Sequence, residues 1–298
     1  MKNLLSIEKL PLADLESILA ASRPLKAKRG RHAEQPLAGQ VWALIFSKSS
    51  TRTRVSFEVA IRELGGQALF LNANDIQLGR GEPIKDTARV VGRMIHGAII
   101  RTFAQSDVEE FANFSGIPTI NALTDDEHPC QIITDIFTFE EKRGPIPGRV
   151  VTLIGDGASN ITNSWIFAAA KLGFELRIAA PAGYQPAPEI LRRAGGKIMV
   201  TEDVKAAATG ADLLYTDVWV SMGQEAQSAE RIKKMTGYQI NESVVRAANP
   251  AALVMHCLPA YKGKEIDEAT FEANAQTIFD QAENRLHVQK AILKWTLS

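Results

Sequence analysis

The stretch "ALIFSKSSTRTRVSFEVAIRELGG" (Ala43–Gly66) decides the fold. It begins with an apolar run typical of a buried strand and, after a polar turn, continues with apolar residues at helical spacing. Two serines, two threonines and two arginines lie within six residues between the run and the helical pattern. Strand, turn and helix in this order form the repeating unit of a parallel α/β domain.

The polar turn predicts an anion site. Free backbone N–H groups and the positive end of a helix face one point there. Ser49, Ser50, Thr51 and Thr53 add hydroxyl donors, and Arg52 adds a planar fork that suits phosphate oxygens. In the alternative interpretation, one hydroxyl is only an N-cap and the arginines are a solvated helix face. Capping does not explain two arginines in the first turn, where positive charge opposes the helix dipole unless an anion is bound.

The same alternation of strand and helix patterns continues along the chain. In the first half, β-branched and apolar runs predict strands at Val41–Phe46, Ala68–Leu71, Ala98–Arg101 and Pro118–Asn121. In the second half they predict strands at Val150–Gly155, Glu175–Ala179, Leu213–Asp217, Leu253–His256 and Thr277–Phe279. The fold class that follows is α/β, with two parallel-sheet domains, and ligands are expected outside the carboxyl ends of the strands.

The domain boundary is expected between residues 130 and 148, where the helix pattern "HPCQIITDIFTFEEKRG" is followed by "GPIPG". We divide the chain into a first domain at 1–134 and a second at 135–280. A last helix at about 281–298 either stays with the second domain or returns to the first. The sequence leaves both placements open.

The composition is that of an ordinary soluble globular protein, with 45% hydrophobic and 23% charged residues. Lysine plus arginine and aspartate plus glutamate balance at 34 each, which argues against a general nucleic-acid or membrane-surface role. Cys130 and Cys257 are too few for a disulfide framework, so a reducing, cytoplasmic setting is expected. The first 22 residues predict an amphipathic helix rather than a signal peptide or a membrane span.

Four spaced motifs carry a resemblance. They are "SSTRTRVSFE", "HPCQ" (His128–Gln131), "DVWVSMG" (Asp217–Gly223) and "HCLPA" (His256–Ala260). In this order they resemble the transcarbamylases, and over nearly its whole length the chain is similar to the ornithine carbamoyltransferases. Any one motif would be a weak signal, whereas four in order are highly specific. The resemblance implies carbamoyl transfer from carbamoyl phosphate to the δ-amine of L-ornithine, without a cofactor or metal.

The resemblance also assigns the residues. It implies catalytic roles for Arg101, His128 and Cys257. For carbamoyl phosphate it implies contacts from Ser50, Thr51, Arg52, Thr53, Gln77, Arg101, His128, Gln131 and Arg285. For ornithine it implies contacts from Asn160, Asp217, Ser221, Met222, Cys257 and Leu258. Simpler interpretations stay open: His128 and Gln131 form a local helix cap, Cys257 is a buried strand-end cysteine, and Cys130 packs as a small apolar residue.

Gln77 belongs to the site by resemblance alone, because the family inserts a glutamine from this loop into the neighbouring subunit's site. The resemblance therefore also implies a homotrimer. It leaves an anabolic or a catabolic role open, and arginine biosynthesis is the expected context. By itself the loop would pass as a polar connection.

Two rival interpretations fail on the residues. "VVTLIGDGASN" resembles a dinucleotide-binding turn, but Asn160 stands in place of the third glycine and the next strand, "ELRIAA", ends without an acidic residue for ribose. A structural zinc site from His128, Cys130, His256 and Cys257 lacks the usual two-residue spacers, which leaves only adventitious zinc at Cys257.

Further alternatives lie within the superfamily or outside catalysis. A relative specific for acetylornithine or putrescine would depart from "SMG", and a non-catalytic carbamoyl-phosphate-binding relative would have lost a catalytic position. Neither change is present. The local departures from the family pattern at Ser47, Ser49 and Tyr261 lie beside the site and are expected to affect substrate affinity more than reaction type.

Overall fold

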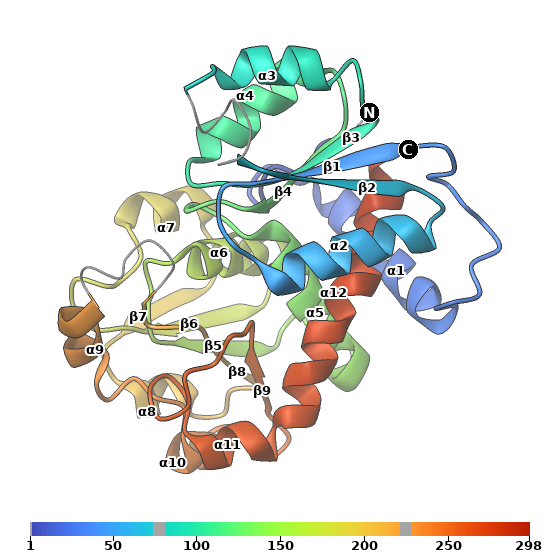
Figure 1. Cartoon of the computed structure of the whole chain (residues 1–298). Coiled ribbons are helices and arrows are strands. Elements are labelled where there is room, and N and C mark those ends of the chain that lie inside the picture. Colours follow the sequence, from blue (N-terminus) through green and yellow to red (C-terminus); the bar gives the residue numbers. More distant parts are fainter. Residues whose placement is uncertain (1, 74–80, 221–227) are drawn as a thin grey trace. The chain divides into compact units, whose positions relative to one another are not determined.

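The computed structural model describes residues 2–73, 81–220 and 228–298. The contacts divide the chain into two compact units (Figure 1). The first contains residues 1–137 and 283–298, and the second contains residues 138–282. Two helices, α5 (Pro129–Arg143) and α12 (Ala275–Thr296), begin in one unit and end in the other.

The first unit is built on a parallel sheet of four strands in the order β2-β1-β3-β4. The strands are β1 (Val41–Phe46), β2 (Gln67–Asn72), β3 (Gly97–Arg101) and β4 (Thr119–Leu123). The helices are α1 (Leu12–Ala27), α2 (Thr51–Glu63), α3 (Ile84–Val91) and α4 (Gln105–Ser115), with the first part of α5 and the last part of α12. Side chains from β1 and β3 pack with α3 and α4 into a buried core that includes Ala43, Ile45, Ala88, Ile100 and Phe111.

The second unit has five parallel strands in the order β7-β6-β5-β8-β9. These are β5 (Val150–Ile154), β6 (Glu175–Ala179), β7 (Ile198–Thr201), β8 (Leu213–Thr216) and β9 (Leu253–His256). The helices are α6 (Asn160–Leu172), α7 (Pro188–Ala194), α8 (Val204–Ala208), α9 (Ser228–Met235), α10 (Glu242–Ala247) and α11 (Glu268–Ala273). The two parallel sheets confirm the predicted fold class.

Three local predictions need correction. The strand predicted at Thr277–Phe279 is wrong, because these residues lie in α12. The β-branched pair in "QTIF" suggested a strand, but Ile278 is buried as part of a long helical face that the local pattern does not reveal. The short strand β7 was missed. The N-terminal helix begins only at Leu12, after Pro11, whereas Leu4 instead forms a bridge with Ile120 beside the sheet.

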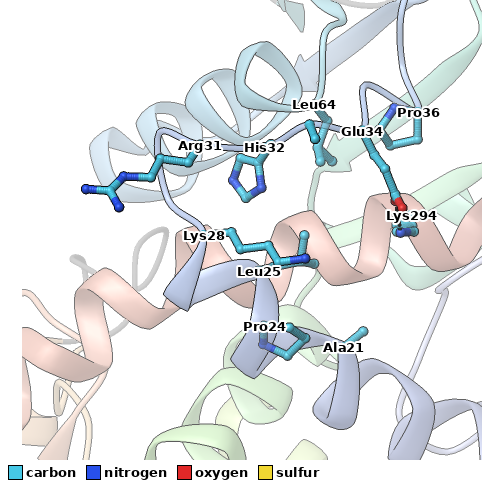
Figure 2. Close-up of a pocket in the computed structure, with 11 residues that line it drawn as sticks. Ala21, Pro24, Leu25, Lys28, Arg31, His32, Glu34, Pro36, Leu64 and Lys294 are labelled. Atoms are coloured by element: carbon cyan, nitrogen blue, oxygen red, sulfur yellow. Dashed lines mark hydrogen bonds and ion pairs between the residues drawn. The ribbon is translucent and has the colours of Figure 1, made fainter.

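The C-terminal part of α12 is fixed within the first unit by a buried lysine. Lys290 donates to Glu63 at 2.6 Å and contacts Nε2 of His32 at 2.9 Å. Burial lowers the pKa of Lys290, and the ion pair with Glu63 opposes that shift. A cavity of about 400 Å³ lies here, and Figure 2 shows the side chain of Glu34 pointing toward Lys294 at one side of it. Nζ of Lys294 donates to Oε2 of Glu34 at 2.6 Å. Lys290 and Lys294 both have acidic partners within the protein. We therefore interpret the cavity as a space left where α12 packs against residues 28–36, and not as a ligand site.

Within the described residues, none of the helices combines the length and the apolar character needed to cross a lipid bilayer.

Candidate functional site

In the first unit, the predicted anion-binding residues lie where the strand order reverses. The chain passes from β1 to β2 on one side and then to β3 on the other, which makes the carboxyl ends of β1 and β3 a topological switch point. The turn at residues 47–53 follows β1, and Arg101 ends β3. The backbone N–H of Ser47 donates to the carbonyl of Arg101 at 2.8 Å, so the turn and the arginine lie side by side.

The turn itself is a capped helix start that retains positive charge. Ser50 is the N-cap of α2, and its Oγ accepts from the backbone N–H of Thr53 at 3.2 Å. The first turn contains no acidic residue. Arg54 is engaged elsewhere, because it pairs with Glu58 at 2.8 Å and lies over an aromatic ring. Among the described residues, Arg52 has no hydrogen bond or ion pair, so capping accounts for Ser50 and not for Arg52.

Arg285 and His128 complete the first-unit cluster, which we define as Ser50, Thr51, Arg52, Thr53, Arg101, His128, Gln131 and Arg285. Nη2 of Arg285 donates to Oγ1 of Thr53, although the two residues lie 232 positions apart in the sequence. His128 is buried immediately before Pro129 begins α5. Burial lowers the pKa of His128 well below its ordinary value, and the charges of Arg285 and Arg101 lower it further. His128 is therefore a neutral imidazole beside two guanidinium groups.

Gln131 and Cys130 have different surroundings on the first turn of α5. The side-chain amide of Gln131 donates to Asp135 at 2.8 Å rather than forming a capping-box bond. Oε1 of Gln131 is buried and has no hydrogen-bond partner among the described residues. Cys130 is fully buried, its thiol donates to the carbonyl of Asn121 at 3.4 Å, and burial raises its pKa to about 12. The predicted packing role of Cys130 agrees with this environment.

Lys48 is a further charged residue at this site that sequence reasoning missed. Its side chain is buried, forms an ion pair with Asp125 and lies 4.3 Å from the ring centroid of Phe103. The turn opens into a cavity of about 450 Å³, lined by Phe46, Ser47, Lys48, Ser49, Ser50, Thr51, Arg54, Val55, Phe70 and Asn72. A lysine two residues before the N-cap was the only signal in the sequence.

The second unit repeats the topological arrangement. Here the order reverses at β5, since the chain passes to β6 and β7 on one side and to β8 and β9 on the other. Asn160, the first residue of α6, follows β5, and Asp217 follows β8. The predicted ornithine residues Asn160 and Asp217 thus flank a switch point of their own. We call Asn160, Asp217, Cys257 and Leu258 the second-unit cluster.

Asp217 and Cys257 are in direct contact. β8 and β9 pair Thr216 with His256, so the next residue of each strand projects at the same edge. The Cys257 thiol donates to Oδ1 of Asp217 at 2.8 Å, and the backbone N–H of Val218 donates to the same oxygen at 2.7 Å. Burial raises the pKa of Asp217, while the neighbouring His256 and the thiol hydrogen bond oppose that rise. A cation bound beside Asp217 would stabilise its carboxylate form.

A hydrogen-bond chain behind Cys257 fixes the "HCLPA" turn. Nδ1 of His256 accepts from the backbone N–H of Leu258 at 2.8 Å, and Nε2 faces the buried carboxylate of Glu265 at 3.2 Å. Leu258 has a positive φ of 61° and is followed by a cis peptide bond to Pro259. The histidine thus holds a backbone conformation that a residue with a side chain rarely adopts. Sequence reasoning missed Glu265, which lies eight residues beyond Cys257 in a polar segment.

The group formed by Asp217, His256 and Cys257 does not fit a metal centre. Ligand atoms of Asp217, His256 and Cys257 lie within 4.8 Å of one another. However, the thiol donates to the carboxylate, and both imidazole nitrogens face partners other than a shared central point. These ligand atoms are therefore occupied by hydrogen bonds within the protein and do not converge on one ion position.

Three predicted residues, Gln77, Ser221 and Met222, lie outside the described residues.

The first comparison with known proteins concerns the family. The model of the aspartate/ornithine carbamoyltransferase carbamoyl-P binding domain matches residues 2–141. The model of the aspartate/ornithine carbamoyltransferase Asp/Orn binding domain matches residues 147–296. Together the matches cover almost the whole chain, so the chain belongs to the aspartate/ornithine carbamoyltransferase family. This confirms the resemblance that the four motifs indicated.

Individual relatives narrow the comparison. An ornithine carbamoyltransferase of Akkermansia muciniphila is 55% identical over 98% of this chain and 97% of its own length. The structure of the anabolic ornithine carbamoyltransferase from Campylobacter jejuni is 41% identical, with a TM-score of 0.93 over 99% of both chains. The structure from Pyrococcus furiosus is also 41% identical, with a TM-score of 0.92 over 98% of this chain and 96% of that one.

The two cysteines should differ sharply in reactivity. Cys257 is partly exposed, whereas Cys130 is fully buried with a pKa of about 12 and therefore carries almost no thiolate near neutral pH. Iodoacetamide at pH 8 should alkylate Cys257 in the folded protein and leave Cys130 unmodified, as read by peptide mass spectrometry. Both should react in urea. Modification of Cys130 in the folded protein at the rate of Cys257 would contradict the described environments.

Proposed function

We propose that this chain transfers the carbamoyl group of carbamoyl phosphate to the δ-amine of L-ornithine and yields L-citrulline and phosphate. The single observation that carries the proposal is the chemical contrast between the two clusters. The first-unit cluster is cationic and lies at a helix N-terminus, which suits a phosphate, and the second-unit cluster has a partly buried carboxylate, which suits an ammonium group. Family membership and the named relatives support the same reaction.

In this proposal, the first-unit cluster binds carbamoyl phosphate. The phosphate lies at the start of α2, on Ser50, Thr51, Arg52 and Thr53, with Arg285 beside it. Arg101 and the N–H of neutral His128 polarise the carbamoyl oxygen and hold the oxyanion that forms on attack. The buried Oε1 of Gln131 accepts from the carbamoyl amino group. A neutral histidine fits this role, because an imidazolium would add a third buried cation to Arg101 and Arg285.

The second-unit cluster binds and orients ornithine. Asp217 carries the charge that faces the α-ammonium, and Asn160 contacts the groups on the α-carbon, with Ser221 and Met222 proposed as further contacts. The sulfur of Cys257 and the carbonyl of Leu258 accept from the δ-nitrogen and direct its lone pair. The Cys257 proton is held by Asp217, so the sulfur orients the amine and does not attack.

Transfer then requires one bond to form and one to break. The neutral δ-nitrogen attacks the carbamoyl carbon, and a tetrahedral intermediate carries the negative charge on the former carbonyl oxygen. Its collapse breaks the bond between the carbamoyl carbon and the oxygen that bridges it to phosphorus. The leaving phosphate takes the electron pair of that bond and accepts the proton that the δ-nitrogen loses. No covalent enzyme intermediate is involved.

Finer properties belong to the same proposal. We propose a homotrimer that acts in the cytoplasm in arginine biosynthesis, without nucleic-acid or membrane partners. Two exposed apolar side chains support the trimer: Val55, which lines the 450 Å³ cavity, is 54% exposed, and Leu69, on β2, is 43% exposed. A neighbouring subunit that covered them would remove this apolar surface from water. Domain limits at 1–134 for carbamoyl phosphate and 135–280 for ornithine remain part of the proposal.

Substitutions in the two units should separate the two ligands. Arg52→Ala removes a charge-assisted contact to phosphate and should weaken carbamoyl phosphate binding by about 2–5 kcal/mol. Asp217→Asn keeps the side-chain shape but deletes the counter-charge, so ornithine should weaken while carbamoyl phosphate stays near wild type. Calorimetry for carbamoyl phosphate and citrulline assays with ornithine, acetylornithine, putrescine and aspartate test both. If the wild-type protein turned over another acceptor in preference to ornithine, the proposed substrate would be wrong.

Two different groups should determine the pH dependence, the substrate amine on the alkaline side and Asp217 on the acid side. Activity should rise from neutral to alkaline pH, because the attacking amine must be neutral and free amines of this kind have a pKa of about 10.4. On the acid side, protonation of Asp217 removes its charge, and its raised pKa makes this loss begin at a higher pH than for an ordinary carboxyl group. KM for ornithine should therefore rise as pH falls. In Asp217→Asn this acid-side rise should be absent, and its persistence would assign it to another group.

Mixed assemblies test whether Gln77 serves the site of a neighbouring subunit. Gln77→Ala and Arg52→Ala should each inactivate the protein. In a mixed trimer, some interfaces bring an intact Arg52 against an intact Gln77 from another chain, so co-refolding the two variants should recover part of the activity. Each variant refolded alone is the control. Mixed trimers verified by mass spectrometry without recovered activity would exclude the shared site but leave the reaction assignment intact.

A further inference from the structure

A buried ion pair joins two turns of the second unit. Asp156 follows β5, and Arg231 lies on α9, 75 residues later. Their side chains are only 5% and 9% exposed. Nη2 of Arg231 donates to Oδ2 of Asp156, and Nε donates to the carbonyl of Trp219 at 3.1 Å. One guanidinium group thus connects the turn after β5 to the turn after β8.

The Asp156 end of this link fixes the start of α6. Oδ1 of Asp156 accepts from the backbone N–H of Ala158 at 3.0 Å, and its carbonyl accepts from Oγ1 of Thr162 at 2.7 Å. Between those two contacts lies Asn160, the first residue of the helix. The position of Asp156 therefore sets the position of Asn160.

The Trp219 end fixes the exit of β8. Trp219 follows Asp217 by two residues and is buried. Its indole closes against Gly155, where an added Cβ would lie 3.6 Å from the ring and where φ is +130°. A glycine is required there by the backbone angle, which lets the two turns approach. The carbonyl that Arg231 holds thus belongs to the segment that carries Asp217.

The chemistry of the link points to positioning rather than stability. A buried ion pair usually gains little over well-packed apolar side chains, because both charges lose their hydration. Burial raises the pKa of Asp156, and the charge of Arg231 opposes that rise. Arginine can hold a carboxylate and a carbonyl at once through its planar fork, which a lysine ammonium does less precisely. The guanidinium also lies 4.8 Å from the ring centroid of Tyr184, so its plane is fixed on a further side.

We propose that Arg231, held by Asp156, is a positioning residue for the amine substrate. It sets the spacing between Asn160 and Asp217, which must grip the same α-carbon. This inference rests on the proposed function of those two residues. It extends that function to a residue outside both clusters that touches no substrate.

The test compares Arg231→Gln, Arg231→Lys and the double variant Asp156→Asn/Arg231→Gln. Arg231→Gln should raise KM for ornithine at least tenfold, with the Kd of carbamoyl phosphate within twofold of wild type. Arg231→Lys keeps the charge but not the planar fork, so its KM for ornithine should lie between those of the wild type and Arg231→Gln. Arg246→Gln, which removes a solvent-exposed arginine of the same unit, is the matched control and should change neither value.

The double variant separates positioning from stability. It leaves no uncompensated buried charge, so its melting temperature should recover relative to Arg231→Gln. The link to Trp219 is still absent, so KM for ornithine should stay raised. If KM returned to the wild-type value together with the melting temperature, Arg231 would be structural only and the proposal would be wrong.

A second readout does not depend on turnover. The chain has four tryptophans, and 5-fluorotryptophan labelling gives each a ¹⁹F resonance. In Arg231→Gln the Trp219 resonance, assigned with Trp219→Phe, should shift or broaden. The resonance of Trp165, packed against Tyr215 in the same unit, should not. An unchanged Trp219 resonance would overturn the proposed role of Arg231 in holding Trp219, even if the wild-type protein proved active. A wild-type protein that is inactive with ornithine would instead overturn only the proposed function.

Discussion

The reversal of strand order within each parallel sheet is the constraint on which both clusters depend. In a parallel sheet the carboxyl ends of all strands lie at one edge, and helices cover the faces. Only where successive connections leave in opposite directions does that edge open into a crevice. The first unit reverses between β1 and β3 and the second between β5 and β8. The predicted site residues follow these strands, so topology alone already favours a ligand site at this place in each unit.

The two crevices then differ by charge. The first gathers Arg101 and Arg285 around a helix N-terminus, and their positive field together with burial keeps His128 neutral. The second holds the partly buried Asp217 against the thiol of Cys257, a neutral hydrogen-bond donor that does not balance the charge of the carboxylate. A chain with balanced total charge thus separates its charges locally. In the proposed function, this separation assigns the anionic substrate to the first unit and the ammonium groups of the amine substrate to the second.

The sequence predicted the elements whose signal is local. β1, β6 and β9 were predicted with their observed bounds, because each is a compact apolar run followed by turn residues. Thr277–Phe279 failed since α12 is defined by contacts over its whole length, and Ile278 looks β-like only in isolation. At the clusters, motif residues such as Ser50 and Asp217 could be named from sequence. Lys48, Asp156, Arg231 and Glu265 could not, because their importance arises from partners 9 to 77 residues away.

This difference reflects how the clusters are assembled. A motif supplies groups that face a ligand, but distant residues hold those groups in place. Thr53 receives its hydrogen bond from Arg285 at a sequence separation of 232, and Lys290 ties the same helix to Glu63 at a separation of 227. Both contacts join α12 to the two ends of α2, so the helix that begins at the proposed anion site is fixed by the last helix of the chain. The first-unit cluster is therefore complete only once α12 has packed, although most of its residues lie in the first half of the sequence.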